Sequence, residues 1–153
     1  LTDTRGTGIM HRLFYGYAPY EGPIQGRRNG VLISNTGGTA TAYALWNLEE
    51  RGVIFIAPGD ELYEGMIIGQ NCRGNDLEFN PLRAKQLTNI RASGKDESIR
   101  LTPPRTFALE QALSYIEDDE LVEVTPKNLR LRKRLLDPHE RKKEQRRREA
   151  EAS

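Results

Sequence analysis

The stretch KQLTNIRASGKD, Lys85 to Asp96, has the residue types of an anion-binding loop. It is polar, carries three cationic side chains and ends in a Ser-Gly-Lys sequence followed by an aspartate. A nucleotide-binding P-loop needs a glycine five residues before its Gly-Lys pair and a Ser or Thr after that pair. This chain has Asn89 and Asp96 at those two places. The sequence therefore predicts a loop that meets an anion but does not bind GTP.

Basic residues flank this loop as well as occupying it. Residues 81–105 contain six Lys or Arg against only Asp96 and Glu97. Aromatic residues do not alternate with these cations, so stacking of single-stranded bases is not the expected binding mode. Recognition of the shape and backbone of folded RNA fits the composition better. The alternative is an ordinary flexible connection, although the length and polarity of the segment favour a functional loop.

A second group of cations belongs to the stretch NLRLRKRLL, whose residues alternate with a period of two. A strand there would place two sets of residues on opposite faces. One face would hold Arg130, Arg132 and Arg134, and the other Leu129, Leu131 and Lys133. Guanidinium groups about 6.5–7 Å apart along a strand can follow successive phosphates of a nucleic-acid backbone. The alternative is that these arginines pair across a hairpin with the acidic residues between 117 and 123.

Residues suited to covalent or metal chemistry are few. The two histidines, His11 and His139, lie far apart in the sequence, and no Cys/His pair has metal-ligand spacing. The acidic run at 117–120 lacks the alternating ligands and central glycine of a calcium loop. Because the helix dipole disfavours carboxylates at the C-terminal end of a helix, this run after the predicted helix suggests nearby cations as partners. We expect no catalytic residue, metal or cofactor in this chain.

Length and composition are those of one domain with a modest core. The 153 residues are 37% hydrophobic and 29% charged, and Cys72 is the only cysteine, which suits a reducing compartment. No apolar run is long enough to span a membrane, and the first ten residues do not resemble a signal peptide; a first residue other than Met suggests a segment of a longer chain. The net charge of +1 conceals an asymmetry, because residues 127–153 hold 11 Lys/Arg against 5 Asp/Glu. Such asymmetry is typical of a surface that binds a polyanion.

Short strands and two helices must position these cations. Strands are predicted at 8–19, 30–35, on both sides of Pro58-Gly59 between 53 and 73, and at 76–80, 98–104, 120–126 and 128–136. The first helix begins after Thr39, with Thr41, Ala44, Leu45 and Leu48 on one face and Gly52 as a left-handed stop. The second helix, at 106–116, has Thr106 as N-cap and a face made of Leu109, Ala112, Leu113 and Ile116.

These elements predict an α+β fold. We expect mainly antiparallel β-structure with two packed helices and a basic C-terminal tail. The tail, from Asp137, is polar and is expected to be helical or frayed.

Four stretches together resemble the C-terminal end of the TypA/BipA translational GTPases. They are TRGTGIMHRLFYGYAPYEGPIQGRRNGVLIS, LEERGVIFIAPGDELYEGMIIG, NDLEFNPLRAKQLTNIRASGKDE and DDELVEVTPKNLRLRKRLL. The resemblance runs from about Leu1 to Arg141 and is specific because several distinctive blocks occur in order. It implies that residues 1–20 are the last strand of an elongation-factor-G-like domain five. Residues 21–136 would be the family-specific C-terminal domain, and 137–153 a charged, frayed tail.

The resemblance also implies partners. In that family the GTPase domain lies upstream, so GTP and magnesium would bind a domain absent from this chain. The loop would reach toward the peptidyl-transferase end of the ribosomal A site, where it meets large-subunit rRNA and the acceptor arm of A-site tRNA. The predicted RNA-binding residues are Arg83, Lys85, Asn89, Arg91, Ser93, Lys95, Arg100, Arg130, Arg132 and Arg134.

The sequence therefore predicts the ribosome-binding domain of a translational GTPase that acts in ribosome assembly and stress adaptation. We expect it to be cytoplasmic and monomeric, to bind the 70S ribosome and to have no membrane association. Two alternatives stay open. One is an RNA-binding module that acts off the ribosome. The other is a protein-interaction domain whose basic tail only confers solubility.

Overall fold

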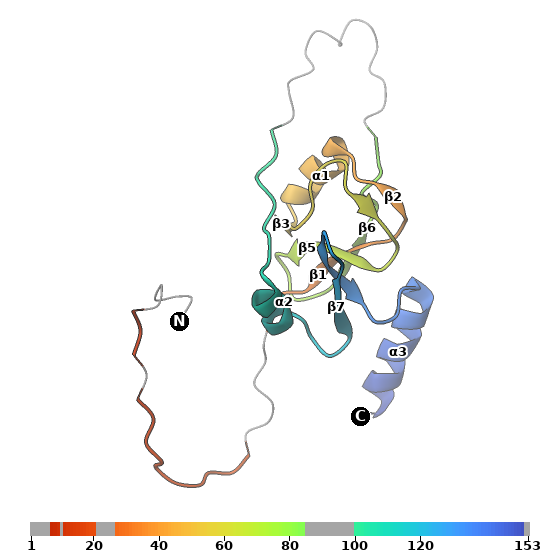
Figure 1. Cartoon of the computed structure of the whole chain (residues 1–153). Helices are drawn as coiled ribbons and strands as arrows, with labels where there is room; N and C mark the ends of the chain where they lie inside the picture. Colours follow the sequence, from red (N-terminus) through yellow and green to blue (C-terminus); the bar gives the residue numbers. More distant parts are fainter. Residues whose placement is uncertain (1–6, 10, 21–26, 85–99, 152–153) are drawn as a thin grey trace, which may run out of the picture.

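A mixed, mostly antiparallel sheet carries the fold, as the computed structural model in Figure 1 shows. The structure describes residues 7–9, 11–20, 27–84 and 100–151. The main sheet contains β1 (Val31–Ser34), β3 (Gly52–Ile54), β5 (Met66–Asn71), β6 (Leu77–Phe79), β7 (Glu120–Val124) and β8 (Leu129–Lys133). Its order is β6-β1-β5-β8-β7, and only the pairing of β6 with β1 is parallel. A small antiparallel pair is formed by β2 (Gly38–Thr39) and β4 (Glu61–Leu62).

Strand β5 is the centre of the sheet. It pairs with β1, while β8 pairs with its first residues, Met66 and Ile67, and β3 pairs with its last residues, Gly69 to Asn71. Nearly all of β5 is buried, as expected for the strand MIIGQN with sheet neighbours and both faces covered. A register shift opposite Leu32 and Ile33 makes a β-bulge in β5 at Ile68.

Two helices cover opposite faces of this sheet. Helix α1 (Ala42–Glu49) buries Ala44, Leu45 and Leu48, as predicted, and two of them join a core with Leu32, Ile54, Met66 and Ile68. Helix α2 (Leu109–Tyr115) packs through Ala112 on the other face, in a second core with Val31, Ile33, Ile67 and Leu131. Neighbouring residues of β1 alternate between the two cores, as the period of a strand requires.

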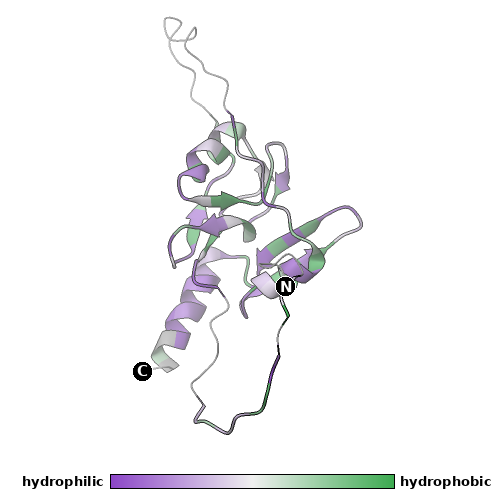
Figure 2. Cartoon of the chain, turned by 90° about the vertical axis from the view of Figure 1, so that its left-hand side faces the viewer, coloured by the Kyte–Doolittle hydropathy of each residue, from purple (hydrophilic) through white to green (hydrophobic). Residues whose placement is uncertain are grey.

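A third helix, α3 (Pro138–Glu151), occupies the tail that the sequence predicted to be helical or frayed. Figure 2 shows it as largely hydrophilic, and Figure 1 shows it apart from α1 and α2. Arg141 connects it to the sheet through an ion pair with Glu78 at 3.1 Å and a hydrogen bond to the Leu135 carbonyl at 2.9 Å. Among the described helices, none is both long and apolar enough to cross a membrane. The α+β class with mainly antiparallel strands is confirmed.

Two predicted strands are wrong for the residues described. Residues 7–9 and 11–20 contain no strand, and neither do residues 100–104 of the predicted strand at 98–104. The first stretch has suitable residues, but a strand exists only when its backbone groups pair with a neighbour. In the second stretch, Pro103 and Pro104 have no N–H to donate to a ladder.

Three details of the helices also differ from the prediction. Helix α2 is capped at Ala108 rather than at Thr106, and it exposes Leu109 and Leu113. Of the predicted face, Ala112 and Ile116 do contact the core, and the aromatic residues Phe107 and Tyr115 add contacts that were not predicted. Gly52 does not end α1 in a left-handed conformation, since it begins β3; a Cβ there would lie 1.8 Å from the Gln70 carbonyl oxygen. The glycine is therefore required by close packing of β3 on β5.

Candidate nucleic-acid interface

Helix α1 holds both borders of the predicted RNA-binding loop. At its N-terminus, the Thr41 hydroxyl accepts from the Ala44 N–H at 3.2 Å and donates to the Arg83 carbonyl at 2.8 Å. At its C-terminus, the Glu49 carboxylate accepts from the Thr102 N–H at 2.5 Å. An eight-residue helix is about 12 Å long. The chain therefore leaves and re-enters the folded domain at opposite ends of one short helix.

Two of the predicted RNA-binding cations lie at these borders. Arg83 and Arg100 are both exposed, and they flank the segment 85–99. The other loop candidates, Lys85, Asn89, Arg91, Ser93 and Lys95, lie outside the described residues.

The arginine strand faces the α1 side of the sheet. Arg132 pairs with Met66 of the α1-side core, and directly opposed residues of an antiparallel ladder point to the same face. Alternation along β8 places Arg130 on this face too, whereas Leu131 joins the opposite core. Arg134 follows the end of β8 and is exposed. The predicted alternation is therefore confirmed for Arg130 and Arg132, and the loop borders and these two arginines share one side of the sheet.

Pairing across the hairpin, the predicted alternative, occurs for one of these arginines. Arg130 lies opposite Glu123, with 4.0 Å between guanidinium nitrogen and carboxylate oxygen. Glu123 also accepts a shorter hydrogen bond, 2.6 Å, from the Tyr63 hydroxyl. Burial raises the pKa of Tyr63, and the hydrogen bond to Glu123 raises it further. Glu123 is thus shared, and the charge of Arg130 is only partly compensated.

The opposite face of β8 holds a buried ion cluster. Lys133, 2% exposed, lies 3.0 Å from Glu120, 2.9 Å from Asp119 and 2.7 Å from Asp76. The Glu120 carboxylate also accepts hydrogen bonds from both terminal guanidinium nitrogens of Arg27, at 2.7 and 2.9 Å. Burial alone would lower the pKa of the Lys133 ammonium, but its carboxylate partners raise it above its ordinary value. The acidic run at 117–120 therefore has cationic partners, as its position predicted.

Arg27 and Asp76 are the members of this cluster that sequence reasoning missed. Arg27 lies 93 residues from Glu120 in the chain, so no local pattern links the two. The Arg27-Arg28 pair just before a predicted strand was the only available signal. Glu117, Asp119 and Glu120 lie close enough together to resemble a metal site, but Lys133 and Arg27 already neutralise Glu120.

Comparison with known proteins identifies the family of this chain. A model of the TypA/BipA C-terminal domain matches residues 29–138. Over 144 residues, the chain is 56% identical to the large ribosomal subunit assembly factor BipA of Buchnera aphidicola subsp. Schizaphis graminum. It is 53% identical to the protein of that name from Haemophilus influenzae and 51% identical to that from Escherichia coli K12. Each alignment covers 94% of this chain, which spans about a quarter of the length of these relatives (23% or 24%). The chain belongs to the TypA/BipA family and contains its C-terminal domain.

Proposed function

We propose that this domain docks its parent protein on the large ribosomal subunit by binding rRNA. The observation that carries the proposal is that α1 holds both borders of a cation-rich segment, with Arg83 and Arg100 exposed beside it. Arg130 and Arg132 extend positive charge along the same side of the sheet. The relatives are named as large ribosomal subunit assembly factors, which supports the ribosome as the partner.

The mechanism is electrostatic and geometric. Lys and Arg side chains neutralise backbone phosphates and release counterions, which provides affinity without reading sequence. The segment 85–99, fixed at its two borders, adds positional specificity by meeting large-subunit rRNA and the acceptor arm of A-site tRNA. The parent is a ribosome-stimulated GTPase whose G domain binds GTP and magnesium, and it works as a cytoplasmic monomer in ribosome assembly and stress adaptation.

Co-sedimentation with isolated 50S subunits and 70S ribosomes at several salt concentrations tests this proposal. Replacing Arg130, Arg132 and Arg134 together by Gln should weaken binding and flatten its salt dependence. Each lost phosphate contact should reduce the slope of log K against log salt by about 0.7 to 0.9. The matched control replaces three cations of α3, Lys142, Lys143 and Arg146, by Gln, and should leave the slope nearly unchanged.

The outcomes separate the alternatives. If the folded β8 triple variant keeps the slope of the unsubstituted chain, its arginines belong to the hairpin and the proposal is contradicted. Equal binding to ribosomes and to generic duplex RNA would indicate an RNA-binding module that acts off the ribosome. Association with a protein partner that salt does not weaken would indicate a protein-interaction domain.

A further inference from the structure

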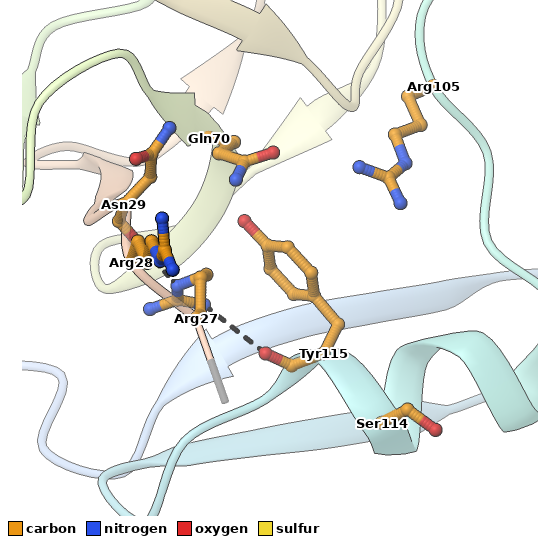
Figure 3. A pocket seen from close by; sticks show the side chains of 7 residues that line it. All are labelled: Arg27, Arg28, Asn29, Gln70, Arg105, Ser114 and Tyr115. Atoms are coloured by element: carbon orange, nitrogen blue, oxygen red, sulfur yellow. Dashed lines mark hydrogen bonds between the residues drawn. The ribbon is translucent and has the colours of Figure 1, made fainter. Parts of the chain in front are cut away.

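A cavity of about 350 Å³ opens on the α2 side of the sheet, opposite the face that carries α1. Three separate parts of the chain line it, as Figure 3 shows: residues 27–29 before β1, Gln70 in β5, and Arg105 with Tyr115 from the α2 region. Nearly all of the polar groups brought together here are hydrogen-bond donors or can act as donors. None of these residues belongs to the interface proposed above.

The bulge in β5 aims Gln70 into this cavity. Without it, strict alternation would give Gln70 the same face as Ile68 and Met66, which belong to the α1-side core. Beyond the bulge, Gln70 pairs with Val31, a residue of the α2-side core, and therefore shares its face. Bulges commonly redirect a side chain beside a functional site.

Tyr115 lies at the centre of the cavity lining. The Cζ atom of Arg27 is 4.8 Å from the centroid of its ring, and that of Arg105 is 5.8 Å away. The Tyr115 hydroxyl is buried and has no hydrogen-bond partner among the described residues. In Figure 3 it points toward Gln70, between Arg28 and Arg105. A buried hydroxyl without a partner is uncommon in proteins and calls for a ligand or water to satisfy it.

The positive charge of the cavity is only partly compensated. Arg27 is neutralised by the bidentate contact with Glu120. Arg28 and Arg105 are both exposed, and neither pairs with a carboxylate in the part of the chain that the structure describes. The Arg105 guanidinium is held over the ring of Phe107, with Cζ 4.6 Å from the centroid, which leaves its N–H edges available.

We propose that this cavity binds a phosphate group. Arg28 and Arg105 contribute charge and forked N–H donors from two sides, and the Tyr115 hydroxyl and Gln70 amide complete the donor set. A tetrahedral phosphate offers oxygens in several directions, so it can accept from donors that converge in this way. The phosphate belongs to an RNA backbone or to a free nucleotide. The site does not depend on the ribosome-docking proposal, because it lies on the other face of the sheet.

Titration of the chain with sodium phosphate, at constant ionic strength against sodium chloride, tests the site. Two-dimensional amide NMR should show saturable shifts at Gln70 and Tyr115. The Arg28→Gln/Arg105→Gln double variant should bind phosphate at least tenfold more weakly. Tyr115→Phe should bind several-fold more weakly while folding normally, since the hydroxyl it removes has no partner in the chain. Lys142→Gln, in α3 and away from the cavity lining, is the control and should bind phosphate unchanged.

Absence of saturable shifts at these two residues, or an unchanged affinity of the double variant, would overturn the proposal. Competition with uridine 5′-monophosphate and with the dinucleotide UpU then identifies the source of the phosphate. Tighter binding of the monophosphate indicates a free nucleotide, and tighter binding of the dinucleotide indicates an RNA backbone; displacement by neither overturns the site. Ribosome co-sedimentation of the same double variant keeps the two proposals distinguishable. A variant that loses phosphate binding but still binds ribosomes shows that the cavity and the ribosome-docking surface are separate sites.

Discussion

At the scale of single residues, Glu120 connects most of the buried charge. Its side chain is fully buried and accepts from Arg27, Lys133 and the Glu117 N–H. A buried carboxylate is tolerated only when cations and hydrogen-bond donors replace its water. The cluster joins the segment before β1 to the β7–β8 hairpin, which otherwise, among the described strands, pairs with the rest of the sheet only where β8 meets β5. It therefore specifies where the hairpin docks.

The same residues predict that the domain loses stability in alkaline solution. The pKa of Lys133 is raised by its carboxylates against the effect of burial, and the pKa of Tyr63 is raised by burial and by Glu123. Because both folded pKa values lie above the unfolded ones, the stability they contribute is complete below about pH 10 and is lost as the pH rises further. Urea unfolding between pH 8 and 11 should show the free energy of unfolding falling above pH 10. Tyr63→Phe should make that fall smaller, and a flat profile to pH 11 would contradict the assignment of these two groups.

At the scale of elements, the contact between β3 and β5 is the tightest that a single substitution can test. A Cβ on Gly52 would meet backbone atoms of Gln70, which cannot move away as a flexible side chain could. Gly52→Ala should therefore lower the free energy of unfolding by about 1–3 kcal/mol or more. Gly16→Ala is the matched control, because nothing lies within 4 Å of its added methyl group and its φ is not in the left-handed region. Equal stability of the two variants, measured by urea unfolding, would show that β3 can shift off β5.

The sequence could predict the elements that are marked by short-range patterns, such as apolar periodicity, a helix cap or a turn sequence. The hairpin of β7 and β8 followed from period-two alternation around a Thr-Pro-Lys-Asn turn, and α1 from an apolar face preceded by Thr41. The buried face of α2 was predicted correctly for Ala112 and Ile116 but not for Leu109 and Leu113, because Phe107 and Tyr115, outside the simple helical stripe, supply the other contacts. Partners distant in sequence could not be predicted at all. The Arg27–Glu120 pair and the Gln70–Tyr115 cavity exist only after the sheet has formed.

At the scale of the whole molecule, positive charge is concentrated on one strand rather than in the tail. Residues 127–136 hold five Lys or Arg and no acidic residue, and four of the five lie outside the buried cluster of Lys133, whereas residues 137–153 hold six against five Asp or Glu. Within α3, Glu144 pairs with Arg147 at 2.8 Å and Arg148 at 3.3 Å, which compensates part of its charge internally. A polyanion would therefore be attracted to the β8 side of the domain and to the borders of the segment 85–99 more than to α3.

This distribution predicts that docking and folding can be separated. Replacing Asn89 to Lys95 by two glycines removes Arg91 and Lys95 but leaves the anchors at Thr41 and Glu49 in place. The melting temperature should change by only a few degrees at most, about what a surface change produces, because the contacts of Thr41 and Glu49 that hold the two borders of the segment are kept. Co-sedimentation with 50S subunits should fall at least tenfold.

The control is a chain that ends after Leu136. This truncation removes α3, whose positive and negative charges nearly balance, and the shortened chain should still bind 50S subunits. If the shortened loop binds ribosomes normally, or if the domain unfolds, the segment is a structural connection. If instead only the chain without α3 loses binding, the charged helix is the docking element.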